Sequence, residues 1–583
     1  MRAVRVLPDV PAIDKAFDYL VPEHLGDQVR VGTMVRIALH GRRVGGWVLD
    51  DEPDPPGEIE LSPIQKVVGV GPDAATIDLC RWVSWRWAGR LATVLRLASP
   101  DRAVREVPPS RRRSVAADGA HPQAAALLAG GAGTSVLQVA PTEDPLGIAL
   151  AAAATGQALV VVPSVAGADH VARGLRRAGA SVARWPGDWA AAAAGATVVG
   201  GRSSVFAPLP ELSAVVVVDE HDEGLQSESS PTWHAREVAV ERAARAGVPC
   251  LLVSPCPSLE ARGVADPAPR LVVRGARSAE RSGWSPTTVV DRRGEDTGRT
   301  GLFSSRLVDA VRETARADRR VLCVLNRTGR ARLLACRSCG TLAECERCGA
   351  SATLGDDLLL HCGRCGASRP GVCMECGSQA LSALRVGVTR AREELEALAR
   401  EPVVAVTGQG TTGVEEARIV IGTEAVLHRF GDVGLVAFAD FDQELLAPRY
   451  RAAEEALALL VLASRALGGR ERGGRLLVQT RLPDHEVIRA ALQADPSIVA
   501  HAEAERRRLL RFPPFAAIAS IADQAAPEYV ARLGQPIGVE VLGPEDGRWL
   551  LRAEDRRTLL DELAAVQRPP GRLRLHVDPA RIR

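Results

Sequence analysis

Short apolar runs that alternate with Ala- and Arg-rich segments dominate the middle of the chain. Between residues 135 and 275 these runs are Leu159–Val162, Thr197–Val199, Val215–Val218 and Leu251–Val253. Continuous runs of valine and leucine are typical of strands in a parallel sheet that is buried on both faces. The alternation resumes near residue 320 and continues to about 480. The pattern therefore predicts two α/β lobes of similar build.

The N-terminal part of the chain follows a different pattern. Apolar residues stand at every second position from Val35 to Leu39, which is the period of a half-buried strand. Residues 1–70 are therefore predicted to be rich in β-structure, with a turn at Arg42–Gly46. Residues 73–98 are predicted to be helical.

These patterns predict an α/β fold with additional domains at both ends. The predicted parts are a β-rich N-terminal domain (1–105), a linker (106–125), lobe 1 (126–275), lobe 2 with an insertion (276–500) and a small α+β C-terminal domain (501–583). The linker contains Arg111–Arg113 and few large apolar residues, as a solvated connection would.

Composition narrows the class of protein. The 583 residues allow about four domains, and 46% hydrophobic with 25% charged residues excludes a disordered or collagen-like chain. The net charge of +2 means that any nucleic-acid surface must be local. The chain has only two lysines, Lys15 and Lys66, so chemistry that needs a lysine must use one of them.

No targeting or membrane segment is predicted. The first residues are an alternating strand pattern, and the longest apolar stretch, Pro145–Pro163, is interrupted at Thr155–Gln157. We therefore expect a cytoplasmic, nucleoid-associated protein without a membrane partner.

Eight of the twelve cysteines are concentrated in residues 336–376. They form four C-x2-C pairs, each followed by glycine: Cys336/Cys339, Cys345/Cys348, Cys362/Cys365 and Cys373/Cys376. Two such pairs complete a tetrahedral four-thiolate site, so the spacing predicts two zinc ions per chain. Disulfides and an iron–sulfur cluster are the alternatives, and a reducing compartment favours metal over disulfides. Four thiolates per ion leave no open position, which indicates a structural role.

Several other motifs carry a resemblance to a known family. They are Phe17–Tyr19 with Pro22, Gly201–Pro208, Trp233–Arg236, Asn326–Gly329, Arg506–Phe515 and Val541–Pro544. Together with the two lobes and the cysteine insertion, they resemble the primosomal protein N′ (PriA) family of replication-restart helicases. The resemblance covers nearly the whole chain and implies RecA-like helicase lobes.

The resemblance also implies roles for particular residues. The N-terminal domain would capture the 3′ end of a DNA strand, with Phe17, Asp18 and Lys66 in contact with DNA. The outer cysteine pairs would share one zinc and the inner pairs the other. The two ligand sets would be Cys336, Cys339, Cys373 and Cys376, and Cys345, Cys348, Cys362 and Cys365. The implied partners are branched or forked DNA, primosome proteins and the replicative helicase.

The chain departs from this family at the phosphate-binding loop. The matching segment, Val139–Leu146, has two prolines and the acidic pair Glu143–Asp144, and it has neither the glycines nor the lysine that cradle phosphates. Asp219, Glu220 and Arg465 remain as a vestigial nucleotide site. The family's winged-helix domain is also missing, because residues 106–125 are too few for one.

The sequence thus predicts a replication-restart protein that recognises stalled or branched forks and promotes reloading of the replicative helicase. It predicts no helicase activity, and ATP binding is doubtful. One alternative is an active ATP-dependent 3′–5′ DNA helicase with an unusual phosphate loop. Another is a zinc-bearing protein scaffold without DNA affinity.

Overall fold

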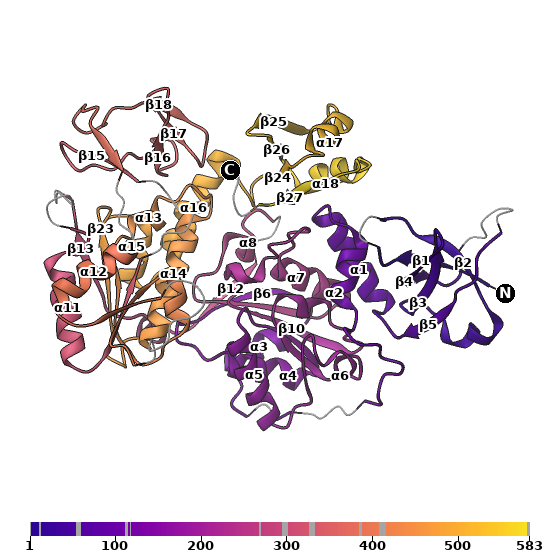
Figure 1. The fold of residues 1–583 in the computed structure, drawn as a ribbon. Coiled ribbons are helices and arrows are strands. Elements are labelled where there is room, and N and C mark those ends of the chain that lie inside the picture. Colours follow the sequence, from indigo (N-terminus) through magenta and orange to yellow (C-terminus); the bar gives the residue numbers. More distant parts are fainter. Residues whose placement is uncertain are drawn as a thin grey trace.

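The computed structural model places most of the chain. It describes residues 2–10, 13–53, 60–110, 115–116, 118–266, 270–293, 301–325, 333–383, 388–406 and 416–579. In Figure 1 the N-terminal sheet lies at one end and lobe 2 at the other, with lobe 1 between them. The cysteine insertion and the C-terminal domain lie side by side above the lobes.

The N-terminal domain is a five-stranded antiparallel sheet in the order β2-β1-β4-β3-β5. Its strands are β1 (Arg2–Pro8), β2 (Phe17–Val21), β3 (Met34–Leu39), β4 (Arg42–Asp50) and β5 (Lys66–Gly69). The predicted alternation holds in β3, where Val35 and Ile37 are buried and Arg36 is exposed. The turn predicted at 42–46 is wrong, because those residues belong to β4. The chain turns at His40–Gly41, where both residues have positive φ.

The helical segment after this sheet is two helices and not one. Four residues separate helix α1 (Ala74–Arg86) from helix α2 (Leu91–Ala98). The break contains Ala88 with φ of 44°, and a Cβ on Gly89 would lie 2.6 Å from the ring of Pro231 in lobe 1. The corner is therefore shaped by tertiary contact, which the helical periodicity does not reveal.

Lobe 1 is a seven-stranded parallel sheet in the order β12-β6-β11-β10-β7-β9-β8. The strands are β6 (Gly133–Gln138), β7 (Gln157–Val161), β8 (Val182–Arg184), β9 (Thr197–Gly200), β10 (Leu212–Val218), β11 (Pro249–Ser254) and β12 (Leu271–Arg274). The helices are α3 (Pro122–Ala129), α4 (Pro145–Thr155), α5 (Val165–Arg177), α6 (Trp189–Ala193), α7 (Ala235–Ala246), α8 (Leu259–Arg262) and α9 (Arg277–Gly283). The central strands are buried on both faces, as their continuous apolar runs predict.

Lobe 2 is a six-stranded parallel sheet in the order β13-β23-β22-β14-β21-β20. The strands are β13 (Thr287–Asp291), β14 (Arg320–Val324), β20 (Val403–Val406), β21 (Ile419–Gly422), β22 (Val433–Phe438) and β23 (Arg475–Thr480). The helices are α11 (Ser305–Arg316), α12 (Val388–Ala399), α13 (Asp442–Leu445), α14 (Ala452–Leu467), α15 (Glu486–Gln493) and α16 (Ser497–Leu510). The α/β prediction with two parallel sheets is confirmed.

The insertion and the C-terminal domain are small and antiparallel. The insertion contains β15 (Leu334–Cys336), β16 (Ala352–Leu354), β17 (Leu359–Cys362), β18 (Ser368–Pro370) and β19 (Leu381–Ala383). The C-terminal domain is a sheet in the order β25-β26-β24-β27 with two helices. Its elements are β24 (Ala517–Ala522), α17 (Ala526–Leu533), β25 (Val539–Glu545), β26 (Arg548–Ala553), α18 (Arg556–Ala565) and β27 (Arg574–Val577).

Two features of the described residues bear on the predictions. Between α2 and α3, the described part of the linker contains no helix, and Arg111–Arg113 lie outside the described residues. Among the helices that the structure describes, none has both the length and the apolarity needed to cross a membrane.

Candidate functional site

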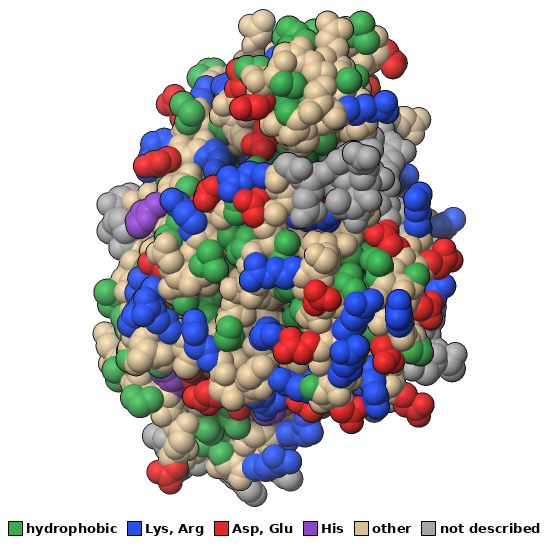
Figure 2. Space-filling model, turned by 90° about the vertical axis from the view of Figure 1, so that its left-hand side faces the viewer, with side chains coloured by type: hydrophobic (Ala, Val, Ile, Leu, Met, Phe, Trp, Pro, Cys, Tyr) green, Lys and Arg blue, Asp and Glu red, His purple; other side chains and the backbone are tan. Residues whose placement is uncertain are grey.

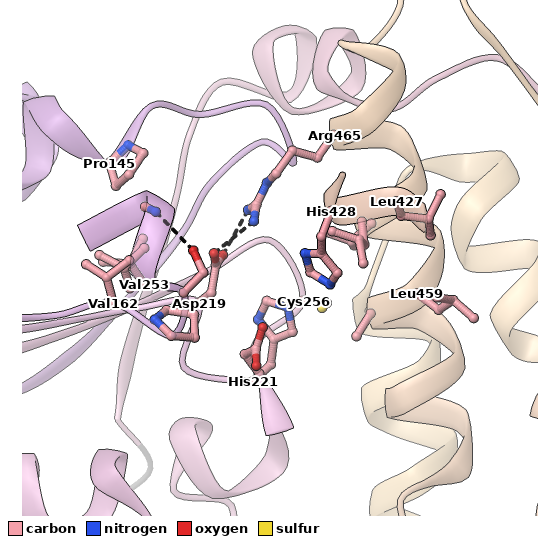
Figure 3. Close-up of a pocket in the computed structure, with 18 of the residues that line it drawn as sticks. Pro145, Val162, Asp219, His221, Val253, Cys256, Leu427, His428, Leu459 and Arg465 are labelled. Carbon is pink, nitrogen blue, oxygen red and sulfur yellow. Dashed lines mark hydrogen bonds and ion pairs between the residues drawn. The ribbon is translucent and has the colours of Figure 1, made fainter. Parts of the chain in front are cut away.

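A cavity of about 680 Å³ lies where the two lobes meet (Figure 3). Lobe 1 lines it with the loop after β6 and with residues that follow β10 and β11. Lobe 2 lines it with α14 and the 3-10 turn Glu424–His428. The carboxyl ends of parallel strands are where α/β proteins bind ligands, so this cavity lies where a ligand site is expected.

The loop after β6 has its own carboxylate where a phosphate would be expected. The side chain of Asp144 caps α4 and accepts the amide N–H of Leu146 at 2.9 Å. Pro145 is the first residue of α4 and has no amide hydrogen. His170 lies 3.0 Å from the Asp144 carboxylate. The amide that would bind an anion at this helix terminus is thus already satisfied by an anionic side chain.

Arg465 of α14 closes the cleft from the side of lobe 2. Its guanidinium makes a bidentate pair with Asp219, with both N–O distances at 2.9 Å. The same side chain donates to the carbonyl of Pro141 at 2.9 Å. Figure 3 shows Arg465 reaching across the cavity toward Asp219. Burial by itself would raise the pKa of the Asp219 carboxyl, but Arg465 keeps that pKa below its usual value.

Glu220 has a different environment from its neighbour Asp219. It is fully buried, and its carboxylate accepts hydrogen bonds from Arg236 at 3.1 Å and from both the amide and the hydroxyl of Ser258 at 2.8 Å. The predicted acidic pair is therefore split between two structural networks. Arg236 lies in the motif Trp233–Arg236, to which the sequence assigned no role, and Ser258 carried no recognisable signal.

His221 couples two segments of lobe 1. Its ring Nδ1 lies 2.8 Å from the Ser254 hydroxyl, so the residue after the acidic pair contacts the end of β11. Burial tends to lower the pKa of His221, but the adjacent Cys256 thiol, Asp219 and Glu220 raise that pKa. The His221 side chain therefore lines the cavity while it contacts the end of β11.

These groups do not fit the triphosphate of a nucleotide with its Mg²⁺. Two carboxylates, Glu143 and Asp144, line the cavity beside the phosphate position, and each would repel phosphate oxygens. Neither lysine of the chain lies in the lobes. Asp219, which would have to hold the metal, is neutralised by Arg465.

A buried arginine joins the lobes outside this cavity. Arg507 of α16 is fully buried and contacts Glu260 of lobe 1 at 3.4 Å and Glu503 of its own helix at 3.0 Å. It also pairs with Glu454 of α14. Arg451 reaches the same Glu260 oxygen at 2.7 Å. The motif Arg506–Phe515 thus contributes a cation shared by both lobes.

The insertion gathers its eight cysteines into two groups of four. One group is Cys336, Cys339, Cys373 and Cys376, and the other is Cys345, Cys348, Cys362 and Cys365. Within these groups, two sulfur–sulfur distances each lie at 3.4–3.6 Å, and all four sulfurs of a group lie within 4.8 Å of one another. Tetrahedral zinc with Zn–S bonds of about 2.3 Å places its sulfurs about 3.8 Å apart. The geometry and the thiolate donors fit one zinc ion in each group.

Each cysteine knuckle has the same local structure. The glycine after its second cysteine has a φ between 69° and 77°, a conformation that other residues seldom adopt. Its amide donates to the carbonyl of the first cysteine at 2.7–3.0 Å, so that both sulfurs point to one side. The C-x2-C-G pattern therefore determines the knuckle conformation locally, which is why these residues could be predicted as metal ligands from the sequence.

The two groups differ in their surroundings. Cys345, Cys348 and Cys362 belong to a buried cluster that includes Tyr450, Leu510, Phe512 and Ile518. Arg364, between two ligands, donates to the carbonyls of Cys348 at 2.9 Å and Ala447 at 2.8 Å. In the outer group Cys376 is exposed. The inner group is thus part of the junction between lobe 2 and the C-terminal domain.

The predicted DNA contacts lie on the N-terminal sheet. Phe17 and Asp18 are in β2 and Lys66 is in β5, at opposite edges of the sheet order. A bridge between Leu20 and Pro63 curls the sheet and brings the segments next to both edges together. Asp18 is held by Arg5 of β1 at 2.8 and 3.2 Å. The sequence did not single out Arg5, and only its place in an alternating strand could have indicated it.

One motif of the sequence cannot be placed. Asn326–Gly329 lies outside the described residues.

Comparison with known proteins agrees with the geometry of the N-terminal sheet. Residues 5–100 match the family model described as the 3′ DNA-binding domain. The probable replication restart protein PriA of Mycobacterium tuberculosis H37Rv is 32% identical over 92% of this chain and 90% of that protein. The chain belongs to the replication restart protein PriA family.

Other relatives match a smaller part of the chain. The PriA protein of Bacillus subtilis is 28% identical over 54% of this chain, and the match spans 42% of that relative's own length. Among solved structures, the DExH-box NTPase HrpB of E. coli matches 64% of this chain at 13% identity, with a TM-score of 0.35.

Proposed function

We propose that this PriA family member acts in replication restart by binding branched DNA and promoting reloading of the replicative helicase, without unwinding DNA itself. The main support for a lack of ATP-driven unwinding is the Asp144 carboxylate. It accepts the hydrogen bond of the α4 amide that a phosphate would need. The Arg465–Asp219 pair gives further support, because the carboxylate that would have to hold Mg²⁺ is already ion-paired with an arginine.

DNA recognition is assigned to the N-terminal domain. The match of residues 5–100 to the 3′ DNA-binding domain supports this assignment. Phe17 would stack on the terminal base, and the Asp18 carboxylate, oriented by Arg5, would accept a hydrogen bond from a 3′ hydroxyl. Lys66 would contact the backbone. Such contacts read the structure of the DNA and not its sequence.

The two cysteine groups would each hold a structural zinc and present the insertion to partner proteins of the primosome. When bound, zinc would supply the cross-links that a segment with little apolar content needs. The inner group supports a role in joining domains, because it packs against residues of the C-terminal domain.

An ATPase assay with and without forked DNA tests the missing motor. We expect no DNA-stimulated hydrolysis above the level of an Asp219→Asn variant, which lacks the carboxylate that pairs with Arg465. Hydrolysis that rises with forked DNA and falls in that variant would mean that the chain is an active helicase.

Fluorescence anisotropy with a forked substrate tests DNA recognition. We expect binding that weakens when the 3′ hydroxyl is replaced by a phosphate, and that loses this preference in Phe17→Ala. Absence of binding to any DNA at low salt would favour a protein scaffold without DNA affinity.

A further inference from the structure

A second cavity, of about 550 Å³, lies between the N-terminal helices and the C-terminal domain. One wall consists of Asp14, Lys15 and the corner between α1 and α2. The other consists of Tyr529 in α17 and residues 563–568 at the end of α18. The sequence assigned nothing to this place, because its walls are more than 400 residues apart in the chain. We call it the N–C groove.

The N–C groove concentrates positive charge. Its lining contains four cations, Lys15, Arg81, Arg90 and Arg568, and one carboxylate, Asp14. The lining residues themselves carry three more positive than negative charges, and two carboxylates next to them, Asp78 and Asp561, are bonded to Arg81 and Trp85. Over the face of lobe 2 and the insertion, by contrast, cations and carboxylates are interspersed (Figure 2). A local excess of cations in a cleft attracts an anionic ligand.

The groove also has an aromatic and apolar lining. Trp85, Leu91 and Val566 contribute to it. The indole N–H of Trp85 donates to Asp561 of α18 at 3.0 Å, which holds the ring at the groove. Cations combined with a ring that can stack are typical of sites for single-stranded nucleic acid.

The walls of the groove are held in place by buried charge. Arg86, next to Trp85, is almost fully buried and pairs with Glu237 of lobe 1 at 2.7 Å and Asp578 of the C-terminal domain at 2.6 Å. Arg568 donates to the carbonyl of Ala88 across the groove. The cavity is therefore preformed, as binding sites usually are.

One end of the groove adjoins the 3′-end residues. The ammonium of Lys15, which lines the groove, lies 5.7 Å from the centroid of the Phe17 ring. A strand whose last base stacks on Phe17 would place its preceding phosphates beside Lys15. The groove would then receive the nucleotides that lead to that base.

From these observations we infer that the N–C groove binds the backbone of single-stranded DNA just upstream of a captured 3′ end. The inference rests on the proposed DNA-binding function and adds a site for it. Lys15, Arg81 and Arg90 would contact phosphates, and Trp85 would stack on a base. Arg568 would keep the two walls together.

The double variant Lys15→Gln/Arg81→Gln tests the groove. Lys15 is exposed, and Arg81 pairs with the exposed Asp78 and makes a long hydrogen bond of 3.4 Å to the carbonyl of Leu49, so the variant is expected to fold normally. A matched control is Arg418→Gln/Arg475→Gln, which removes two exposed, ion-paired arginines of lobe 2. Thermal unfolding of all three proteins checks that their folds are equally stable. Arg81→Lys with wild-type Lys15 should keep the binding.

Anisotropy is measured with single-stranded DNA that ends in a 3′ hydroxyl or a 3′ phosphate, over a range of salt concentrations. We expect the groove variant to bind both DNAs about 10-fold more weakly than the control, and its plot of log K against log salt to be shallower by about 1.4, or about 0.7 per lost phosphate contact. The preference for a 3′ hydroxyl should remain.

The outcomes separate this inference from the proposed function. If the wild-type chain binds DNA and the groove variant matches the control in affinity and salt dependence, the groove inference is wrong and the proposed function stands. If the wild-type chain binds no DNA at low salt, both are wrong. A loss of the 3′ hydroxyl preference in the groove variant would also overturn the inference, because the groove would then be part of the end site.

Discussion

The cysteine insertion and the loop after β6 are both ligand-binding segments by family pattern, but their chemistry differs. In the insertion, all eight thiols converge in two groups with sulfur–sulfur distances close to those around zinc. In the loop, Asp144 and Pro145 replace the groups that a phosphate requires. The comparison teaches that a segment which depends on its ligand to fold must keep every residue that binds the ligand. A loop that folds without its ligand can lose all of those residues.

The loop keeps its fold because protein groups substitute for the ligand. Asp144 caps α4. Arg465 neutralises Asp219 and thereby links the two lobes. The insertion has no such substitute, since its described strands are three or four residues long and its buried clusters are small. The following experiments would break or sharpen this contrast.

The largest effect is expected for Cys348→Ser in the inner group. The variant should lose one of two zinc ions, and because structural zinc contributes on the order of 10 kcal/mol to such a module, the inner half should unfold. Metal analysis by mass spectrometry and limited proteolysis measure this. A variant that keeps two zinc ions would show that the predicted ligand set is wrong.

A smaller effect is expected for Cys376→Ser in the outer group. This cysteine is exposed, so its zinc should be lost with little change at the junction with the C-terminal domain. The midpoint of thermal unfolding should fall less than in Cys348→Ser. Equal falls in both variants would contradict the difference between the two groups.

A still smaller effect is expected for Arg465→Gln at the lobe interface. The change removes a bidentate charge-assisted pair and leaves Asp219 without its partner, at a cost of about 1–3 kcal/mol. Chemical denaturation measures the free energy of unfolding, and Arg475→Gln, an exposed arginine of the same lobe, is the control. No difference between the two variants would mean that the pair does not stabilise the closed cleft.

The same ion pair predicts a pH dependence. Because the folded pKa of Asp219 lies below its unfolded value, the pair stabilises the fold above the unfolded pKa, and this stabilisation is lost as pH falls below about 4. The stability difference between wild type and Asp219→Asn should therefore shrink on acidification through that range. A difference that is constant with pH would contradict the assignment.

The smallest effect is expected on addition of ATP and Mg²⁺. With carboxylates at the phosphate position, the thermal unfolding midpoint should not move, since a ligand stabilises only a state that it binds. A reproducible increase that saturates with ATP would show that the cleft still accepts a nucleotide.

Sequence patterns predicted those parts of the molecule whose structure is determined by residues that are close together in the chain. The valine runs became buried parallel strands, and the four knuckles are defined by four-residue segments and a glycine. The break between α1 and α2 was not predicted, because it depends on Pro231 in lobe 1. Neither was the N–C groove, whose walls belong to opposite ends of the chain.

The candidate site divides in the same way. The departure from a phosphate loop could be read from one short segment, Val139–Leu146, which has Glu143 and Asp144 and lacks the glycines and lysine. The pairing of Asp219 with Arg465 joins residues 246 positions apart, and the separate network of Glu220 depends on Ser258, which no motif marks. Such contacts follow from tertiary packing, which spacing along the chain does not encode.

The shared cation Arg507 has a mechanical consequence. To swing the lobes apart, the protein would have to separate Glu260 of lobe 1 from Arg507 and Arg451 of lobe 2, and that largely buried carboxylate would lose both cations. Breaking a buried pair in this way costs about 3–5 kcal/mol. Lobe 1 and lobe 2 should consequently tumble in solution as one rigid particle. They should show little of the opening and closing on which strand translocation depends.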